Sequence, residues 1–582
     1  MDLEILMPGQ ETILAVNDLS IAFGGKEKFT AVNKISFSID KGRTLAIVGE
    51  SGSGKSLTAL ALMGLLPNGA ELSGEVRLNL PESEARINFT SGTQNEKLLK
   101  GDLRLATYDI RLIRGKHIGM VFQEPMSSLN PVMRIGKQLK EALLVHQDLS
   151  NSSAKELAEE WLAKVQLPEP EKIYNRYPHQ LSGGQKQRVM IAMAMCNHPA
   201  LLIADEPTTA LDVTVQQEII RLMDYLQQEH RSAMIFITHD LSLAATIADD
   251  VLVMYKGMVM EYGPAEQVLQ YPQNFYTRAL LACKPSAEKK GLPLPVVADY
   301  MAAGSGTGKV IAEPKVIAMP ADKGSLIEVN NLRVWFPEHT NMLGKTTSYF
   351  KAVNDVSFTI NKGETLGLAG ESGCGKSTLS RSLAGLIPVY SGELLFKGRD
   401  LAKLSLPEWR AVRKDIQMIF QDPYSSLNPR MTIGDMLREP LRIHNTVYAS
   451  DMDKEVKRLL ELVQLPAATG NRYPHQFSGG QRQRIGIARA LAMRPQLLIC
   501  DESVSALDVS IQAQILNLLN ELQQELGLTY LFISHDLTVV HYFSDRVMVM
   551  HHGKIIEFGS ADDVLKRPKE TYTRKLVDAI PV

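Results

Sequence analysis

Two stretches of the chain decide its fold: GESGSGKSLT at residues 49–58 and GESGCGKSTL at residues 370–379. Each follows a short apolar run, TLAIVG or TLGLAG, that predicts a strand, and each leads into an apolar segment, LTALALMGLL or TLSRSLAGLI, that predicts a buried helix. Glycines let such a loop curl and point its backbone N–H groups inward, while the lysine and the start of the following helix attract phosphate. Two matches in this context predict nucleotide binding. The expected nucleotide-binding residues of the two loops are Gly49, Ser51, Gly52, Gly54, Lys55, Ser56 and Leu57, and Gly370, Ser372, Gly373, Gly375, Lys376, Ser377 and Thr378.

The rest of the sequence repeats as well. The two loop lysines are 321 positions apart, whereas three later matched pairs, at 182 and 478, 205 and 501, and 239 and 535, are each 296 apart. A constant offset indicates two copies of one fold. The decrease in offset locates extra residues in the first copy, at about 81–115, whose role the sequence does not reveal. We expect one domain at 1–285, a flexible linker at 286–325 rich in Ala, Gly, Pro and Lys, and a second domain at 326–582.

Composition limits the class of protein. The chain has 582 residues, a net charge of −2 and 45% hydrophobic residues, which is typical of a globular protein without a general nucleic-acid-binding surface. Its four cysteines are scattered and form no zinc or disulfide pattern. The sequence contains no apolar run long enough to span a membrane. One cysteine, Cys374, lies in the second glycine-rich loop beside a predicted helix N-terminus, where we expect a lowered thiol pKa unless it is simply an inert small residue.

A pair of acids follows a predicted strand in each copy, in LLIADEP and LLICDES. Asp205 and Asp501 are expected to bind Mg²⁺ together with the loop hydroxyls of Ser56 and Ser377. The neighbouring acids, Glu206 and Glu502, are positioned to act as general bases toward a water molecule. The alternative is a pair of solvated acids at a strand end. It is less consistent with the sequence, because the pair recurs in the second copy at the same offset as the other motifs.

The segments HQLSGGQKQR and HQFSGGQRQR resemble the signature of ABC ATPases, which few other phosphate-loop proteins carry. The resemblance implies an α/β fold with two tandem P-loop NTPase domains, each with a RecA-like core and a helical subdomain. It also implies that Ser182 and Gly184 of one half, or Ser478 and Gly480 of the other, close on the nucleotide bound by the partner half. The resemblance thus implies that both ATP sites are composite. Two copies are needed because each site takes residues from both halves of the chain.

Further residues match the family's motifs. Gln123 and Gln421 match the Q-loop that contacts Mg²⁺ and senses the membrane partner, and His239 and His535 match the switch histidine. The D-loop is matched by the aspartates Asp212 and Asp508. The family's adenine-stacking aromatic residue is matched by Phe23 and Phe336, for which core packing is a nearly equal alternative.

The segments FQEPMSSLNPVMRIG and FQDPYSSLNPRMTIG, and the tails NFYTRALL and TYTRKLV, resemble the dipeptide, oligopeptide and nickel importers. A fusion of two such ATPases is similar to glutathione importers and their peptide-importing relatives. The resemblance implies a bacterial ATPase at the cytoplasmic face of the inner membrane, with ATP and Mg²⁺ as cofactors. Its expected partners are two permease subunits and an extracytoplasmic solute-binding protein, and its cargo stays open among glutathione, dipeptides, oligopeptides and nickel chelates.

Three other classes of tandem ABC ATPase fit these features less well. A ribosome-associated factor would carry a long, charged, helical linker, and a DNA-repair ATPase would carry zinc cysteines. A sugar-importer ATPase usually has one degraded site, whereas both sites are intact here. The ribosomal factor is the main alternative to the importer.

Overall fold

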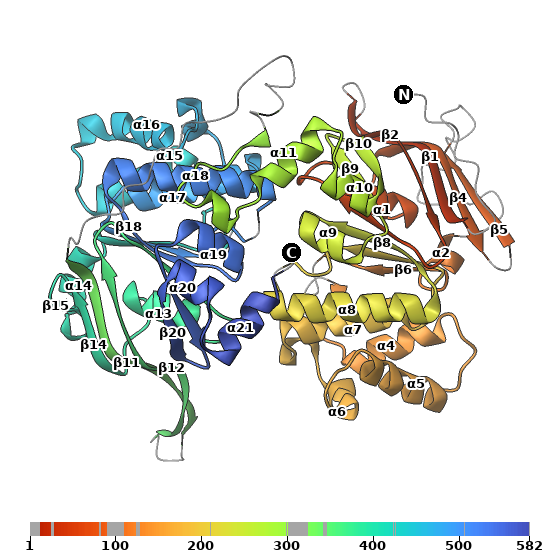
Figure 1. The fold of residues 1–582 in the computed structure, drawn as a ribbon, viewed down its shortest axis with the longest axis horizontal. Helices are drawn as coiled ribbons and strands as arrows, with labels where there is room; N and C mark the ends of the chain where they lie inside the picture. Colours follow the sequence, from red (N-terminus) through yellow and green to blue (C-terminus); the bar gives the residue numbers. More distant parts are fainter. Residues whose placement is uncertain are drawn as a thin grey trace. The chain divides into compact units, whose positions relative to one another are not determined.

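The computed structural model describes residues 12–24, 28–80, 83–89, 110–123, 128–209, 211–297, 300, 324–340, 346–422, 424, 426–505 and 507–580. These residues form two compact units whose main division lies between Leu281 and Ala282, with the short segment Asp212–Thr214 assigned to the second unit (Figure 1). Each unit combines a six-stranded sheet, a four-stranded sheet and a set of helices, which confirms the predicted α/β class and the duplication. Among the described helices, none combines the length and apolar character that a membrane span requires.

The first unit contains β1 (Thr12–Phe23), β2 (Phe29–Asp40), β3 (Thr44–Val48), α1 (Lys55–Leu62), β4 (Ala70–Leu80), β5 (Ser83–Phe89), α2 (Ile110–Ile113), β6 (Ile118–Val121), α4 (Ile135–Leu144), α5 (Asn151–Lys164), α6 (Pro170–Asn175), α7 (Gly183–Met195), β7 (Leu201–Asp205), α8 (Val213–His230), β8 (Ala233–Thr238), α9 (Leu241–Ile247), β9 (Asp250–Tyr255), β10 (Met258–Pro264), α10 (Ala265–Gln270) and α11 (Phe275–Cys283).

The second unit contains β11 (Ser325–Thr340), β12 (Thr346–Asn361), β13 (Thr365–Ala369), α13 (Lys376–Leu383), β14 (Ser391–Phe396), β15 (Arg399–Asp400), α14 (Leu406–Val412), β16 (Ile416–Ile419), α15 (Ile433–Ile443), α16 (Met452–Leu462), α17 (Gly479–Leu491), β17 (Leu497–Asp501), α18 (Val509–Leu526), β18 (Thr529–Ile533), α19 (Leu537–Phe543), β19 (Arg546–His551), β20 (Lys554–Ser560), α20 (Ala561–Lys566) and α21 (Thr571–Asp578).

The larger sheet of each unit positions the site. Its order is β10-β9-β3-β8-β7-β6 in the first unit and β16-β17-β18-β13-β19-β20 in the second. The strands β9, β3, β8, β7 and β6 pair in parallel, so their carboxyl ends meet at one edge. The central strands are buried on both faces, as in β3 and β7, because helices cover parallel sheets. Segments that follow these strands therefore converge although they are far apart in the sequence.

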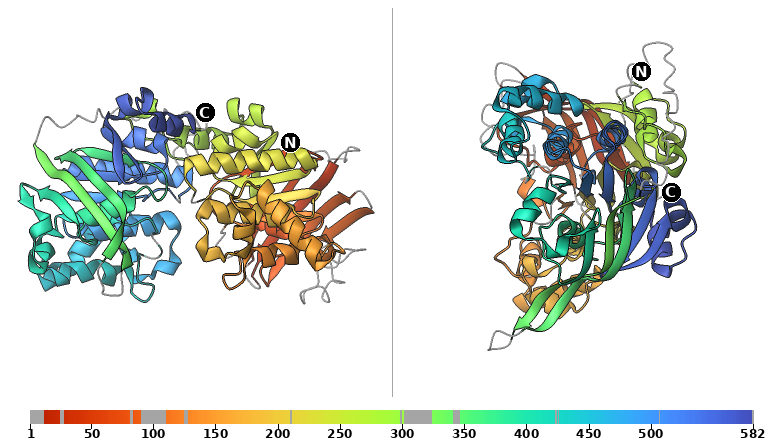
Figure 2. Two further views of the ribbon diagram at one scale, coloured as in Figure 1. Left: turned by 90° about the horizontal axis from the view of Figure 1, so that it is seen from below. Right: turned by 90° about the vertical axis from the view of Figure 1, so that its left-hand side faces the viewer.

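The smaller sheet of each unit is antiparallel, with the order β2-β1-β4-β5 or β12-β11-β14-β15. Part of the insertion predicted at 81–115 forms β5, which pairs with β4 from Gly74 to Leu80, whereas residues 81–82 and 90–109 lie outside the described range. Its counterpart β15 has only two residues. In the second unit β11 and β12 instead form a long antiparallel ribbon (Figure 2).

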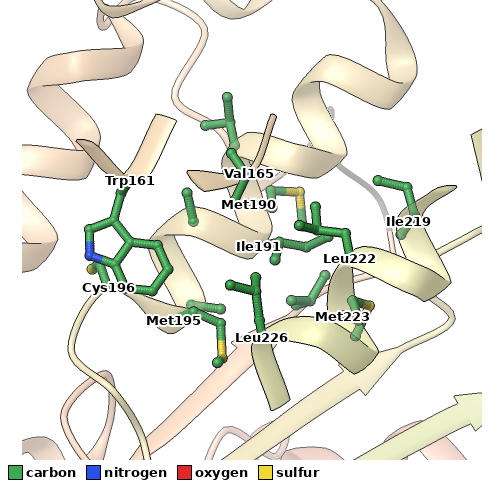
Figure 3. Packing of buried hydrophobic residues seen from close by; sticks show 14 of the residues in the cluster. Trp161, Val165, Met190, Ile191, Met195, Cys196, Ile219, Leu222, Met223 and Leu226 are labelled. Atoms are coloured by element: carbon green, nitrogen blue, oxygen red, sulfur yellow. The ribbon is translucent and has the colours of Figure 1, made fainter. Parts of the chain in front are cut away.

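One apolar core of the first unit lies between helices and one face of the larger sheet (Figure 3). Trp161 of α5 packs there with residues of α7 and α8, among them Ile191, Met195 and Leu226. All four side chains are buried. A separate cluster lies between the two sheets and includes Phe37, Ile47 and Leu62. The two cores therefore cover opposite faces of the larger sheet, since neighbouring residues of β7 and β8 alternate between them.

The segment after α11 packs against the second unit. Lys290 donates to the Ser544 carbonyl at 2.6 Å, and the Tyr542 hydroxyl donates to the Leu292 carbonyl at 2.7 Å. Asn517 exchanges two hydrogen bonds with the backbone of Leu294, at 2.8 and 2.7 Å. Residues 290–294, expected to belong to a flexible linker, are thus fixed to helices of the second unit. Residues 301–323 of that expected linker lie outside the described range.

Candidate functional site

The glycine-rich loop of the first unit joins β3 to α1, as predicted. Gly54 has φ of 102°, and a Cβ there would lie 2.8 Å from Val32 Cγ2 and 3.0 Å from the Ala31 carbonyl oxygen. Only glycine fits such a left-handed, crowded position. Lys55 Nζ donates to the carbonyls of Gly49 and Glu50, at 2.7 and 3.0 Å. The lysine thus closes the loop around its own backbone.

The second unit builds the same loop between β13 and α13. Lys376 Nζ donates to the carbonyls of Gly370 and Glu371, at 2.7 and 2.8 Å. Gly375 has φ of 111°, and a Cβ there would lie 2.3 Å from the Ala352 carbonyl oxygen. The equal geometry indicates that both loops can accept the same ligand.

Hydroxyl and carboxylate oxygens meet beside each loop. Ser56 Oγ donates to Asp205 Oδ1 at 3.0 Å, and Ser377 Oγ donates to Asp501 Oδ1 at 3.3 Å. Mg²⁺ prefers oxygen ligands at about 2.0–2.1 Å in octahedral geometry, so neighbouring ligands lie about 2.9 Å apart. The donor set and its spacing therefore fit Mg²⁺. Burial raises the pKa of Asp205 to about 6 and also raises that of Asp501.

The second acid of each pair is surrounded by donors. Glu206 Oε2 accepts from Gln123 Nε2 at 3.1 Å and from the Thr209 hydroxyl at 2.9 Å, and it lies 3.3 Å from His239 Nδ1. Burial by itself would raise the Glu206 pKa, but the bonds from His239 and Thr209 and the charges of His239 and Lys55 outweigh it and lower the pKa to about 2. The carboxylate is thus held ionised. Its backbone is in the left-handed region, with φ of 46°.

The second unit repeats this cluster with one difference. Glu502 Oε2 accepts from Gln421 Nε2 at 2.6 Å and lies 3.6 Å from His535 Nδ1. Its pKa is also lowered, because the bond from His535 and the charge of Lys376 outweigh burial. The residue equivalent to Thr209 is Ser505, which donates to the Glu502 backbone carbonyl at 2.9 Å and not to the carboxylate.

The structure therefore brings together the expected loop lysine, loop serine, paired acids, glutamine and histidine in each unit. Sequence reasoning missed Thr209, although its place three residues after Glu206 could have suggested a local hydrogen bond. The backbone N–H of Gln185 donates to Ser182 Oγ at 3.3 Å, which caps α7, and Gln481 does the same to Ser478 at 3.4 Å in α17. These serines open helices as predicted.

The glycines of the signature have a packing role. A Cβ on Gly184 would lie 2.7 Å from Val215 Cγ1, and one on Gly480 would lie 2.3 Å from Ile511 Cγ2. The aromatic candidates have mixed environments. Phe23 is partly buried against the core of its unit, which favours the packing alternative, whereas Phe336 is 37% exposed.

The expectation for Cys374 is wrong. Its side chain is buried, and burial raises the thiol pKa despite the nearby charge of Lys376. The Sγ atom faces the loop, because a Cβ on Gly370 would meet it at 2.9 Å. Contact with the interior outweighs the influence of the helix end, so the cysteine fills space inside the loop.

Two family models and several proteins of known description match this chain. The ABC transporter family model matches residues 32–209 and 353–505, and the model of the oligopeptide/dipeptide transporter C-terminal region matches residues 260–302 and 556–582. The Escherichia coli K12 glutathione import ATP-binding protein is 47% identical over 98% of this chain and 90% of its own length. The protein of the same description from Pectobacterium atrosepticum is 44% identical over 99% of this chain and 91% of its own length. A solved dimer of the ATP-binding cassette MJ0796 with ADP and Pi aligns with 40% of this chain and 98% of that chain, with 27% identity and a TM-score of 0.37.

Proposed function

Because the chain belongs to the ABC transporter family, we propose that it hydrolyses ATP to drive the import of glutathione or a related short peptide. Two independent matches support this cargo class. The relatives described above are glutathione import ATP-binding proteins, and both tails match the oligopeptide/dipeptide transporter C-terminal region. The observation that carries the hydrolytic part is the partly buried, ionised glutamate beside each phosphate loop, held by a glutamine and a histidine.

In the proposed chemistry, Glu206 and Glu502 accept a proton from the attacking water. A low pKa keeps each carboxylate available as an acceptor, and the histidine and glutamine that bond to it fix its direction. Lys55 and Lys376 turn from the loop carbonyls toward the phosphates when nucleotide enters. Ser56 with Asp205, and Ser377 with Asp501, would hold Mg²⁺, which neutralises phosphate charge when it is bound.

The signature residues belong to the same proposal. By the family resemblance, Ser182 and Gly184 complete the site of Lys376, and Ser478 and Gly480 complete the site of Lys55. Intact lysine, glutamate, histidine and signature residues in both units support two active sites. Binding of ATP would then favour association of the halves and hydrolysis would release it, as in a two-state conformational switch.

The import function requires other chains. We propose two permease subunits as the membrane partners and an extracytoplasmic solute-binding protein as the source of cargo. The chain would then lie at the cytoplasmic face of the inner membrane, held there by the permeases.

The test is uptake of isotope-labelled glutathione by native cells that lack the chain, complemented either with the unmodified chain or with Glu206→Gln/Glu502→Gln. We expect uptake to be lost in the deletion and restored only by the unmodified chain. Labelled di- and tripeptides added in parallel identify a peptide cargo if glutathione uptake is unchanged. Mild affinity purification gives the second readout. Co-purification of ribosomal proteins without any membrane protein would contradict the import function.

A further inference from the structure

Each tail carries a tyrosine that reaches the phosphate loop of its own unit. The backbone N–H of Glu50, the second residue of the first loop, donates to the Tyr276 hydroxyl at 3.4 Å, across 226 residues of sequence. In the second unit the N–H of Glu371 donates to the Tyr572 hydroxyl at 3.1 Å. The two tyrosines are 296 positions apart, the same offset as the catalytic motifs. The contact is thus a duplicated feature of both units.

In both units the chain segment before the tyrosine helix is fixed by hydrogen bonds to a glutamate carboxylate. The carboxylate of Glu261 in β10 accepts from the backbone N–H groups of Gln273 and Asn274, at 2.7 and 3.3 Å, directly before α11. In the second unit Glu557 of β20 accepts from the N–H groups of residues 569 and 570, at 2.8 and 3.2 Å, directly before α21. Two backbone bonds to one carboxylate set the position at which each helix begins.

An arginine closes the same turn from inside each helix. Arg278 Nε donates to the Pro272 carbonyl at 2.8 Å, and Arg574 Nε donates to the Pro568 carbonyl at 3.0 Å. The turn before each tyrosine helix is therefore held both by the glutamate of the preceding strand and by the arginine of the helix itself.

The tyrosine rings are held by contacts with other aromatic rings, tilted in the first unit and stacked in the second. The Tyr276 ring lies 4.4 Å from that of Tyr255 at the end of β9, and the Tyr572 ring lies 3.9 Å from that of His551 at the end of β19. Tyr276 is fully buried. The β-hairpins that supply Tyr255 and His551 also reach the loops, because Gly257 N–H donates to the Ser53 carbonyl at 3.0 Å and Gly553 N–H to the Cys374 carbonyl at 2.9 Å. Each loop is thus held at its start by the tail and further along by the hairpin.

The tyrosine acts on the residue that the catalytic lysine also contacts. Lys55 Nζ binds the carbonyl of Glu50, while Tyr276 holds the N–H of the same residue. Lys376 and Tyr572 have the same relation to Glu371. A phosphate loop binds through several backbone N–H groups at once, so fixing its entry residue reduces the ordering required when nucleotide binds.

We propose that Tyr276 and Tyr572 are positioning residues for the two phosphate loops, through which the tail of each unit sets its affinity for nucleotide. The inference rests on nucleotide binding at these loops, which is part of the proposed function. It gives the tails a role in ATP binding. Removing one neutral hydrogen bond of this kind should weaken binding about two- to ten-fold.

The experiment uses the full chain with Tyr276→Phe and Tyr572→Phe, separately and together, because phenylalanine keeps the ring stacking. Matched controls are Tyr262→Phe, which removes a hydroxyl that donates to the Ser38 carbonyl at 3.1 Å, and Tyr542→Phe, which removes the bond to Leu292. Fluorescent N-methylanthraniloyl-ATP titrations give Kd. Steady-state kinetics give KM and kcat, and thermal unfolding without nucleotide gives Tm.

We expect Kd and KM to rise about two- to ten-fold in the double variant, with kcat at saturating ATP within two-fold of the unmodified chain. The controls should leave Kd and KM unchanged even where Tm falls equally. An unchanged Kd in the double variant, or an equal rise in the controls, would overturn the inference while the proposed function stands. Failure of the unmodified chain to bind the nucleotide would overturn both.

Discussion

The two units share one catalytic design but differ in how the surroundings support it. At the start of β3 and β9, Arg43 Nη2 lies 3.2 Å from Asp250 Oδ2. At the equivalent positions in the second unit the charges are exchanged, and Arg546 Nη1 lies 3.1 Å from Glu364 Oε1. Because either orientation joins the same two strands, the fold requires opposite charges there and not particular residues. The catalytic positions tolerate no such exchange, since their chemistry depends on residue type.

Differences between equivalent helix residues of the two units also explain why the segment after α11 bonds to α18 and α19. Asn517 of α18 and Tyr542 of α19 bond to that segment, whereas the equivalent positions in the first unit are Arg221 and Thr246. The side-chain amide of asparagine offers both N–H donors and a carbonyl acceptor and so pairs with both backbone groups of Leu294. Arginine offers donors only. The duplicated helices have therefore diverged at these two positions, and the residues of the second unit are the ones that can bind this segment in that way.

The largest expected effect tests whether the two catalytic clusters are equal. Glu206→Gln and Glu502→Gln, made separately, should each lower ATP turnover at least about two-fold, because each removes the general base of one of two sites, and together they should lower it about a hundred-fold or more. Steady-state phosphate release measures this, with the exposed Glu266→Gln as control. Turnover at the unmodified rate in either variant would show that the two units are not catalytically equivalent.

The next largest effect is expected on stability, from exchanging the charges of the Arg546–Glu364 pair. Glu364→Arg should destabilise the second unit by about 3–5 kcal/mol, since it leaves like charges at a site where the Glu364 side chain is only 6% exposed. Adding Arg546→Asp recreates the pair of the first unit and should restore most of this loss. Arg43→Glu should cost only about 1 kcal/mol, because the Arg43 side chain is 45% exposed.

Chemical denaturation, monitored through hydrogen exchange in β3 and β13, measures the loss of stability in each unit. Equal losses in the two units would contradict the explanation from burial, and no recovery in the double variant would contradict the pairing itself.

The Thr209 hydroxyl beside Glu206 predicts a smaller difference, in hydrolysis rate, between the two units. Thr209→Ala removes a donor to the Glu206 carboxylate and should lower the hydrolysis rate at the site of the first unit about two- to ten-fold, whereas Ser505→Ala should have less effect at the other site because Ser505 donates to a backbone carbonyl. Single-turnover assays with each variant measure this difference. Thr209→Ser keeps the hydroxyl and should retain most of the activity. A larger loss in Ser505→Ala than in Thr209→Ala would reverse the comparison.

The smallest effect concerns the segment held by the second unit. Asn517→Ala should raise hydrogen exchange at residues 290–297 and lower stability by about 1–2 kcal/mol, because two backbone bonds are lost. Arg221→Ala, at the equivalent position, is the control and should leave exchange in that segment unchanged. Unaltered exchange after Asn517→Ala would show that the remaining contacts, the bonds of Lys290 and Tyr542 and the burial of Leu294, are enough to hold the segment.

The sequence by itself determined the duplication, the α/β class, the strand-loop-helix at each phosphate loop and the acids that end β7 and β17. These features are local: glycine spacing, short apolar runs and a constant offset report them without any long-range contact. The family and its importer branch followed from motifs of the same local kind. Even the helix caps at Ser182 and Ser478 are determined within four residues.

Only the tertiary structure decided which groups meet. Gln123, Glu206 and His239 follow three different strands, and their contacts depend on the order of those strands in a parallel sheet. The raised pKa of Cys374 depends on burial, which outweighed the nearby positive charge and the helix end that the sequence made visible. The contact of Tyr276 with Glu50 spans 226 residues. Local sequence encodes the elements, but the solvent exposure and partners of a side chain depend on the packing of elements far apart in the chain.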